Sequence, residues 1–212
     1  MIKSFASTIS IAIAPLVLIA CQTTGSTTSS LTPASAPMPA VEQRLTEPGA
    51  SYTILQQDGS ELVVEILSVE GDLVLSKSSS GCTWKRDFTG YRPNPEWNNC
   101  GGSSGTQTSR RTSGSIFPLA VGKTETWDYS GTNSNGDAWE STRDCKVEGE
   151  VSVTVPAGTF DTYHVRCEDR WWVREWFIDG RGLAVQYART RKRGAADGNR
   201  SGKLVSYTPA ST

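Results

Sequence analysis

Residues 145–155 alternate strictly between two kinds of side chain. Every second position is apolar or small: Cys145, Val147, Gly149, Val151, Val153 and Val155. Polar side chains fill the intervening positions: Lys146, Glu148, Glu150, Ser152 and Thr154. Because successive side chains of a β-strand point to opposite faces, this pattern predicts a long strand with one buried and one solvated face.

A second strand is predicted from Phe160 to about Glu168, after a break at Pro156–Thr159. Further strand candidates are Tyr52–Gln57, Glu61–Val69, Leu73–Ser76, Lys123–Ser130, Trp139–Arg143, Trp171–Ile178, Leu183–Thr190 and Lys203–Tyr207. Turn signals such as Asp58-Gly59 separate them, and no stretch after residue 21 has a convincing helical period. The sequence predicts an all-β fold, an antiparallel meander that forms a sandwich or an open barrel.

Four cysteines lie in this predicted domain: Cys82, Cys100, Cys145 and Cys167. An even number in an exported chain indicates two disulfides, with three connectivities open. We expect the two pairs that are local in sequence, Cys82–Cys100 and Cys145–Cys167. Since the chain has one histidine and no Cys-x-x-Cys pair, we expect no metal site and no cofactor.

The Cys145–Cys167 pair constrains the strand register. If Val155 pairs with Thr159 across a three-residue loop, Cys145 and Cys167 are diagonal neighbours. Diagonal Cβ atoms are roughly 7 Å apart, whereas a disulfide needs roughly 4 Å. The sequence therefore predicts a β-bulge that consumes extra residues in the first strand, near Gly149.

The amino-terminal segment is typical of an export signal. After Lys3, residues 5–20 carry no charge, and this run is shorter than the roughly 20 residues that span a bilayer. Leu18-Ile19-Ala20-Cys21 resembles the lipobox of bacterial lipoproteins. The resemblance implies cleavage before Cys21 and lipidation of its thiol, palmitate included, and Gln22 favours the outer membrane. The alternatives are an uncleaved membrane anchor and a plain secretory signal.

The domain organisation follows from these boundaries. Residues 1–20 form the signal peptide, and residues 21–50 are the lipidated Cys21 and a Ser/Thr/Pro-rich linker, which we expect to be a disordered tether. Residues 51–208 form a single β domain, followed by a tail at 209–212. Within the domain, Gly90–Ser115 is rich in Gly, Pro and Asn, and we expect a surface loop tied down by Cys82–Cys100.

Two surfaces are candidates for partner binding. Trp172 and Trp176 alternate onto one strand face, and an apolar face that does not pack in the core needs a partner; both faces being buried is the alternative. A basic hairpin end holds Arg189, Arg191, Lys192 and Arg193, together with Arg200 and Lys203. It fits anionic lipid headgroups, lipopolysaccharide phosphates or peptidoglycan carboxylates, although basic runs are often only solvated tips. The net charge of −1 and the export signal argue against nucleic acid.

Catalytic signals are weak. His164 shares a predicted face with polar residues, so we expect a solvent-facing histidine rather than the base of a triad. Glu148 and Glu150 fall on one strand face beside Lys146 and Arg166, which indicates a mixed-charge surface rather than a glycosidase pair.

Two motifs resemble those of known families. They are Phe117-Pro118-Leu119 followed by Val121-Gly122-Lys123, and Val153–Phe160 with its Val-Pro-Ala-Gly-Thr-Phe core. They are similar to signatures of uncharacterised DUF3108-like and TapB-like bacterial envelope proteins. The resemblance spans residues 117–187 and implies a β-rich fold and an envelope address, with no catalytic residues to transfer.

The leading hypothesis is a lipid-anchored, non-enzymatic outer-membrane protein that serves structure, assembly or partner binding on the periplasmic or surface face. Its partners would be the membrane, through the lipid on Cys21, and an envelope protein, lipopolysaccharide or peptidoglycan. A carrier that encloses a small apolar ligand is the first alternative. An envelope hydrolase is the second, and it needs His164 or a carboxylate pair in a cleft.

Overall fold

A computed structural model of the chain describes residues 31–44, 46–193 and 198–211. These residues form thirteen strands: β1 (Thr32–Pro33), β2 (Ser51–Gln56), β3 (Glu61–Glu70), β4 (Leu73–Ser78), β5 (Thr83–Asp87), β6 (Glu96–Cys100), β7 (Ser103–Gly114), β8 (Thr124–Asn133), β9 (Ala138–Val155), β10 (Gly158–Glu168), β11 (Trp172–Asp179), β12 (Ala184–Arg191) and β13 (Arg200–Thr208). No helix in the described ranges is long and apolar enough to cross a membrane.

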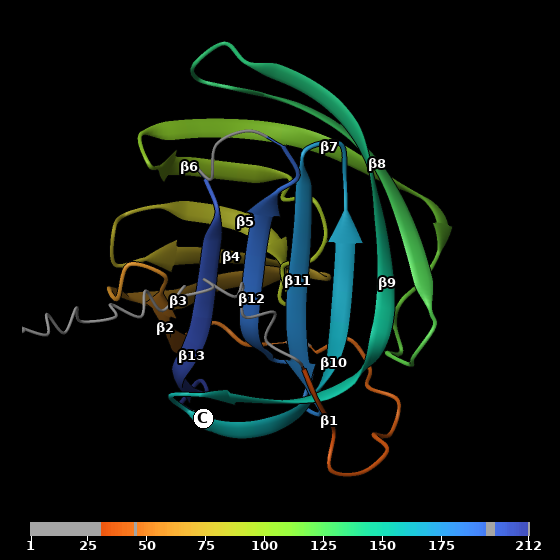
Figure 1. Cartoon of the computed structure of the whole chain (residues 1–212). Coiled ribbons are helices and arrows are strands. Elements are labelled where there is room, and N and C mark those ends of the chain that lie inside the picture. The colour runs from red at the N-terminus through yellow and green to blue at the C-terminus, as the bar shows by residue number, and fades with distance from the viewer. Residues whose placement is uncertain (1–30, 45, 194–197, 212) are drawn as a thin grey trace, which may run out of the picture. The chain divides into compact units, whose positions relative to one another are not determined.

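The strands from β2 to β13 form a closed antiparallel barrel (Figure 1). Each strand pairs with the next along the chain, and β13 closes the ring by pairing with β2, for example at Tyr207 and Tyr52. The predicted all-β antiparallel meander is confirmed, and the closing pair makes it a closed barrel rather than a sandwich or an open barrel. The short strand β1 pairs with β9 at Val151 and Ser152, beyond the residues of β9 that pair with β8.

The long hairpin of β9 and β10 contains the predicted bulge. Val155 pairs with Gly158 across a two-residue turn, and His164 pairs with Gly149 whereas Val165 pairs with Val147. Glu148 is therefore the extra, unpaired residue of the bulge. On the amino-terminal side of Glu148, the shifted register places Cys145 directly opposite Cys167. Both expected disulfides, Cys145–Cys167 and Cys82–Cys100, are present.

The bulge also reverses the faces of β9, because one extra residue shifts the alternation by one position. Cys145 and Val147 belong to a core cluster with Tyr163, Val165, Trp176 and Ile178. Val151, Val153 and Val155 point to the opposite face and join a second cluster with Phe177, Ile54 and Leu204. The single buried face that the alternation predicts is thus divided between the two faces of the hairpin.

The residues between β5 and β6 reach from one wall of the barrel to another. Tyr91, fully buried, donates a 2.8 Å hydrogen bond to Glu125 of β8, and Arg143 of β9 donates a 2.8 Å hydrogen bond to the Tyr91 carbonyl. This segment, residues 88–95, helps to fill the barrel. The expected loop over Gly90–Ser115 is wrong, since β6 and β7 occupy most of it. The Cys82–Cys100 bond joins the residue before β5 to the last residue of β6.

The expectation of a disordered tether is also wrong for its described part. Residues 31–44 and 46–50 pack against the barrel, where Val41 is buried and exchanges two backbone hydrogen bonds with Leu119. Tyr163 donates hydrogen bonds to the carbonyls of Met38 and Pro39. The sequence signal was hidden because backbone pairing and a few buried side chains, Val41 and Ala50 among them, hold a segment that has no apolar periodicity.

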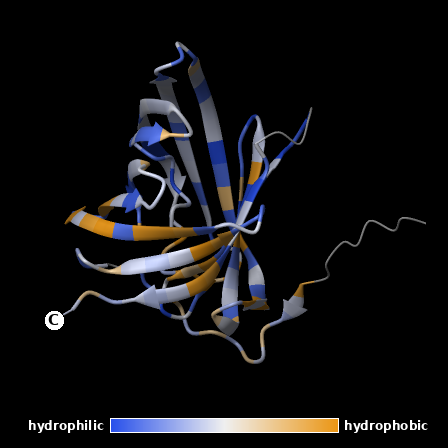
Figure 2. Ribbon diagram, turned by 90° about the vertical axis from the view of Figure 1, so that its left-hand side faces the viewer, coloured by the Kyte–Doolittle hydropathy of each residue, from blue (hydrophilic) through white to orange (hydrophobic). Residues whose placement is uncertain are grey.

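Hydrophobic residues concentrate toward one end of the barrel. In Figure 2 the strands that cross the lower half carry most of the orange colour, whereas the strands that project at the top are mostly blue and pale. The projecting part consists of the start of β7, the end of β8 and the start of β9 (Figure 1). The two ends of the barrel therefore differ in chemistry. We call the projecting end, where polar residues predominate, the polar end.

Candidate functional site

The expected lipidation residue, Cys21, lies outside the described residues, so its lipidation stays a prediction. The described chain places the other candidates on β11 and on the hairpin of β12 and β13. Trp176 is a core residue with 7% of its surface exposed, and it pairs with Val165 and Tyr187. Its expected role in a partner surface is wrong, because the cluster that contains Val165 and Ile178 covers this face of β11.

Trp172 lies four residues before Trp176 on the same face of β11 and is only partly buried. The guanidinium of Arg189 lies 4.3 Å from the centroid of its ring, and that of Arg191 lies 5.6 Å away. Such contacts hold a guanidinium plane against an aromatic face. The sequence suggested Trp172 and the basic hairpin end as two separate surfaces, and the structure makes them one.

Three arginines stand side by side on three neighbouring strands. Arg174 of β11 pairs with Arg189 of β12, which pairs in turn with Arg200 of β13. Directly opposite residues have Cβ atoms about 5 Å apart, and like charges in such positions repel. We call these three residues the arginine row. It follows the row of buried Trp176, half-buried Tyr187 and buried Gly202 on the same face of the strands, so the arginines lie on the inner face of the barrel wall.

Only one arginine of the row has a carboxylate partner among the described residues. Arg174 forms an ion pair with Asp169, whose side chain is fully buried. Arg189 instead donates two hydrogen bonds to the carbonyl of Gly198, at 2.7 and 3.1 Å. Burial, with the charges of Arg200 and Arg174, lowers the pKa of Arg189 to about 10. Among the described residues, the charge of the row is therefore only partly compensated.

Asp169 anchors this end of the barrel. Tyr129 donates a 2.9 Å hydrogen bond to it, and Arg143 lies 3.8 Å from the same carboxylate. Burial raises the pKa of Asp169, but Arg174, a backbone amide and Arg143 outweigh it, so the pKa lies below its usual value. Burial, assisted by the charge of Arg174, lowers the pKa of Arg143 to about 10. The carboxylate is thus ionised and fixed between two cations.

Arg86 reaches the same region from β5. It donates a 3.4 Å hydrogen bond to the hydroxyl of Tyr52, and its guanidinium lies 5.4 Å from the centroid of Trp84. Burial raises the pKa of Tyr187 above its usual value, although the charges of Arg86, Arg200 and Arg189 oppose this shift. Positive charges on β5, β12 and β13 therefore act on this phenol.

The other residues of the basic hairpin end lie on the surface of the domain. Arg191 and Arg193 are exposed, and Lys192 forms a 2.7 Å ion pair with Glu168. Sequence reasoning missed Arg174, Arg86 and Asp169. The alternation of Trp172 with Arg174 was visible, but the cross-strand register that joins them to Arg189 was not.

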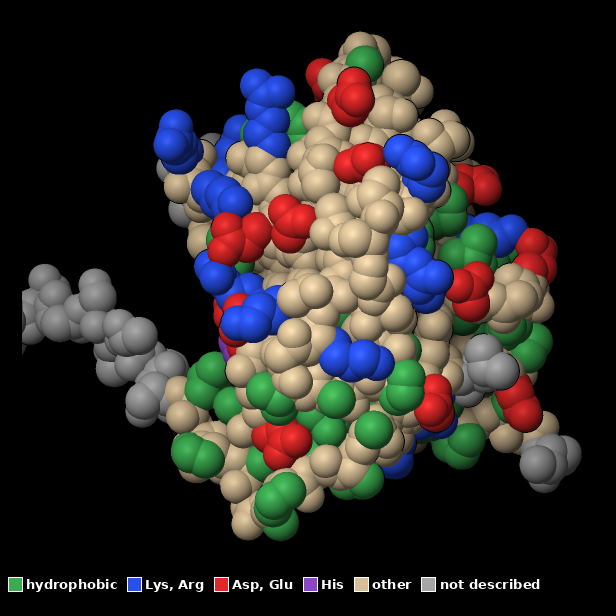
Figure 3. All heavy atoms as spheres, turned by 90° about the vertical axis from the view of Figure 1, so that its right-hand side faces the viewer, with side chains coloured by type: hydrophobic (Ala, Val, Ile, Leu, Met, Phe, Trp, Pro, Cys, Tyr) green, Lys and Arg blue, Asp and Glu red, His purple; other side chains and the backbone are tan. Residues whose placement is uncertain are grey.

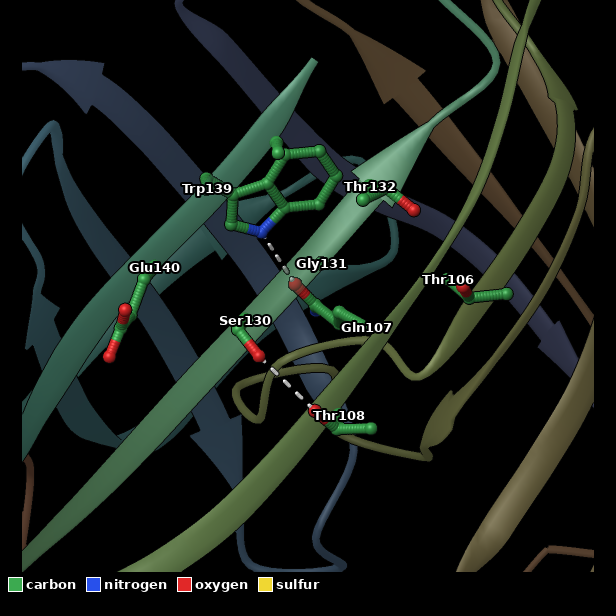
Figure 4. Close-up of a pocket in the computed structure, with 9 residues that line it drawn as sticks. Thr106, Gln107, Thr108, Ser130, Gly131, Thr132, Trp139 and Glu140 are labelled. Carbon is green, nitrogen blue, oxygen red and sulfur yellow. Dashed lines mark hydrogen bonds between the residues drawn. The ribbon is translucent and has the colours of Figure 1, made fainter. Parts of the chain in front are cut away.

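An aromatic pair connects β6 with the projecting part of β9. The rings of Trp97 and Trp139 have centroids 5.8 Å apart. Trp139 also donates a 3.3 Å hydrogen bond to Gln107 (Figure 4). Trp139 lies over Gly131, where a Cβ would be 2.7 Å from the indole. A shallow pocket crosses these strands, with hydroxyl groups of Thr108 and Ser130 hydrogen-bonded at 3.3 Å beside it.

The outer face of β8, β9 and β10 carries charges of both signs, which Figure 3 shows interspersed among tan side chains. Lys146 pairs with Glu148 at 2.6 Å and Arg166 with Glu168 at 2.7 Å, around a second shallow pocket. Glu150 does not share this face, because the bulge turns it toward the backbone amide of Met38, from which it accepts a 3.0 Å hydrogen bond. The expectation that both glutamates share one face is wrong for that reason.

His164 is buried, which corrects the expectation of a solvent-facing histidine. Its Nε2 lies 2.9 Å from Oε1 of Glu175, and its ring stacks on Phe177 at 4.8 Å. This face is covered because the bulge sends Val151 and Val153 to it. The hydrogen bond from His164 lowers the pKa of Glu175 more than burial raises it.

No family model matches the chain, and no curated protein matches it. Among solved structures it is similar to a hypothetical lipoprotein, YmcC, of Escherichia coli K12. The TM-score is 0.52 and the identity 11%, over 79% of this chain and 87% of that one. A putative exported protein with a YmcC-like fold from Bacteroides fragilis matches 79% of this chain and 99% of its own, with 10% identity and a TM-score of 0.43. The first likeness establishes a shared fold.

Proposed function

We propose that this chain is a non-enzymatic binding module, held at the bacterial outer membrane by lipid on Cys21, that engages an envelope component through the polar end of its barrel. The observation that carries the proposal is the arginine row beside Trp172. Like-charged side chains directly opposite each other weaken a sheet, so their presence on three strands indicates a binding role. The resemblance to DUF3108-like and TapB-like proteins and the fold shared with a hypothetical lipoprotein support the envelope address.

Two other functions fit the described residues less well. A carrier of an apolar ligand needs an empty apolar interior, whereas two hydrophobic clusters and residues 88–95 fill the lower barrel. A hydrolase based on His164 needs a nucleophile beside it, and the side-chain hydrogen bond of His164 in the described chain goes to Glu175.

The address is tested by fractionation. Replacing Cys21 by Ala should abolish incorporation of labelled palmitate and release the protein from the outer-membrane fraction. Unchanged fractionation and labelling of the Cys21→Ala protein would contradict lipid anchoring at this residue.

Partner binding is tested by photo-crosslinking in intact envelopes. A photoreactive amino acid at Arg191, exposed beside Trp172, should give a discrete crosslinked product. The same group at Thr154, exposed at the tip of the β9–β10 hairpin, is the matched control. Equal crosslinking from both positions, or none from position 191, would refute binding at the polar end.

A further inference from the structure

The arginine row has the geometry of an anion site. Each guanidinium presents a planar fork of donors that matches the oxygens of a phosphate or a carboxylate. Arg189 is held by stacking on Trp172 and by two hydrogen bonds to Gly198, so its orientation is fixed before any ligand arrives. A site whose side chains are already ordered loses less entropy on binding.

The charge balance indicates the charge of the ligand. Asp169 carries one negative charge between Arg174 and Arg143, and within the described ranges no carboxylate lies within ion-pair distance of Arg189 or Arg200. The described residues around the row therefore leave an excess of positive charge, and a dianion would offset more of this excess than a monoanion. A phosphomonoester carries nearly two negative charges at neutral pH and three terminal oxygens, whereas a carboxylate carries one charge and two oxygens.

The surroundings add a further donor. Tyr187, which carries a hydroxyl group, lies two residues before Arg189 on the same face of β12. Trp172 offers an aromatic surface at the outer edge of the site and remains partly exposed. Ligand oxygens at the arginine row would therefore meet donors from several strands, with a ring beside them for the non-phosphate part.

We propose that Arg174, Arg189 and Arg200, with Trp172 at their edge, bind the phosphomonoester group of an envelope ligand. The site deepens the proposed function and rests on it. The same chemistry occurs in a soluble sugar phosphate and in a lipid headgroup, and the experiment separates these sources.

The test is a calorimetric titration of the full mature protein with glucose 6-phosphate, with glucose and acetate as matched ligands. Binding of the phosphate, with weaker or absent binding of glucose and acetate, is the expected result. The double variant Arg189→Gln/Arg200→Gln should weaken binding by roughly tenfold to a hundredfold, since hydrogen bonds to charged groups are lost. Arg189→Lys keeps the charge but loses the fork, and should also bind more weakly.

Arg110→Gln is the control, because Arg110 is an exposed arginine of β7 whose ion pair is with Asp128. Its affinity should equal that of the unchanged protein. Equal affinity of the double variant, no binding of the phosphate, or equal binding of acetate would overturn the proposal. Far-ultraviolet circular dichroism checks that each variant is folded, and Arg189→Lys serves if the double variant is not.

Vesicles separate the two sources of phosphate. If the ligand is a lipid headgroup, vesicles with phosphatidic acid should retain the protein more strongly than vesicles of phosphatidylcholine alone, and the double variant should lose this difference. If it is soluble, glucose 6-phosphate binds and the vesicles make no difference. A crosslink from position 191 together with no phosphate binding would reject the phosphate site and leave the proposed function standing.

Discussion

Tyr129 donates a 2.9 Å hydrogen bond to Asp169, a carboxylate that also lies between Arg143 and Arg174. Asp169 and Arg143 are both buried, with 0% and 7% of their side-chain surfaces exposed. Removing one member of a buried ion pair leaves the other charge without compensation. This group of four residues should therefore control the stability of the polar end.

Asp169→Asn should lower the free energy of unfolding by roughly 3–5 kcal/mol, because Arg143 and Arg174 lose their counter-charge. Urea unfolding followed by tryptophan fluorescence measures the change. Asp144→Asn is the control: Asp144 is exposed and accepts one hydrogen bond from Thr126, so its effect should stay within about 0.5 kcal/mol. A cost for Asp169→Asn as small as the control's would show that the buried carboxylate is not needed.

The same residue predicts an acid dependence. The pKa of Asp169 is lowered in the folded state, so the folded form binds its proton less readily than the unfolded form. The stabilisation is complete above the unfolded pKa of about 4, and it is lost as the pH falls through the lower folded pKa. Stability measured from pH 7 to pH 2 should fall less steeply in Asp169→Asn than in the unchanged protein.

The disulfides should differ in their access to reductant. Cys145 and Cys167 are buried at 3% and 0% exposure, whereas Cys82 and Cys100 are half-buried. A thiolate must reach a disulfide sulfur to attack it. Under native conditions, a mild reductant followed by alkylation and mass spectrometry should label Cys82 and Cys100 first. Earlier labelling of Cys145 and Cys167 would mean that the core opens more readily than the packing implies.

The sequence predicted most of this hairpin, but its register differs from the expected one by two residues. The expected loop between Val155 and Thr159 had three residues, whereas the observed turn has two, and this accounts for one of the two shifts that bring Cys145 opposite Cys167. The bulge at Glu148 supplies the other. The disulfide constraint predicted the bulge, but its consequence for the burial of His164 was missed, because alternation was read as continuous through the bulge.

The candidate site was less predictable for a related reason. The residues of β7 are polar on both faces, so their pattern lacks the apolar alternation by which strands are recognised. The arginine row depends on the pairing of β11 with β12 and of β12 with β13, and no local pattern fixes those registers. The sequence predicted Trp172 as part of an aromatic strand face, and it predicted Arg189 as part of a separate basic hairpin end.

Gly202 lies under the ring of Tyr187, next to the arginine row. An added Cβ would be 2.3 Å from Cε1 of Tyr187 and 2.6 Å from Cγ2 of Ile54, so Gly202→Ala should cost roughly 1–3 kcal/mol through overpacking. Gly149→Ala is the matched control, because no heavy atom lies within 4 Å of its Cβ position. Thermal unfolding of both variants tests this, and equal melting temperatures would contradict the close approach of Tyr187.

The packing of the amino-terminal segment gives the last prediction. Val41 is 5% exposed and pairs with Leu119 through backbone hydrogen bonds of 2.7 and 3.3 Å, whereas Val121, two residues beyond Leu119, is 54% exposed. Val41→Ala should lower the free energy of unfolding by roughly 2 kcal/mol, since a buried side chain is shortened and a cavity is left. Val121→Ala removes the same atoms from an exposed site and should change it by less than about 0.5 kcal/mol. Equal effects in urea unfolding would mean that residues 31–44 do not contribute to the stability of the barrel, and the tether would then extend to the start of β2.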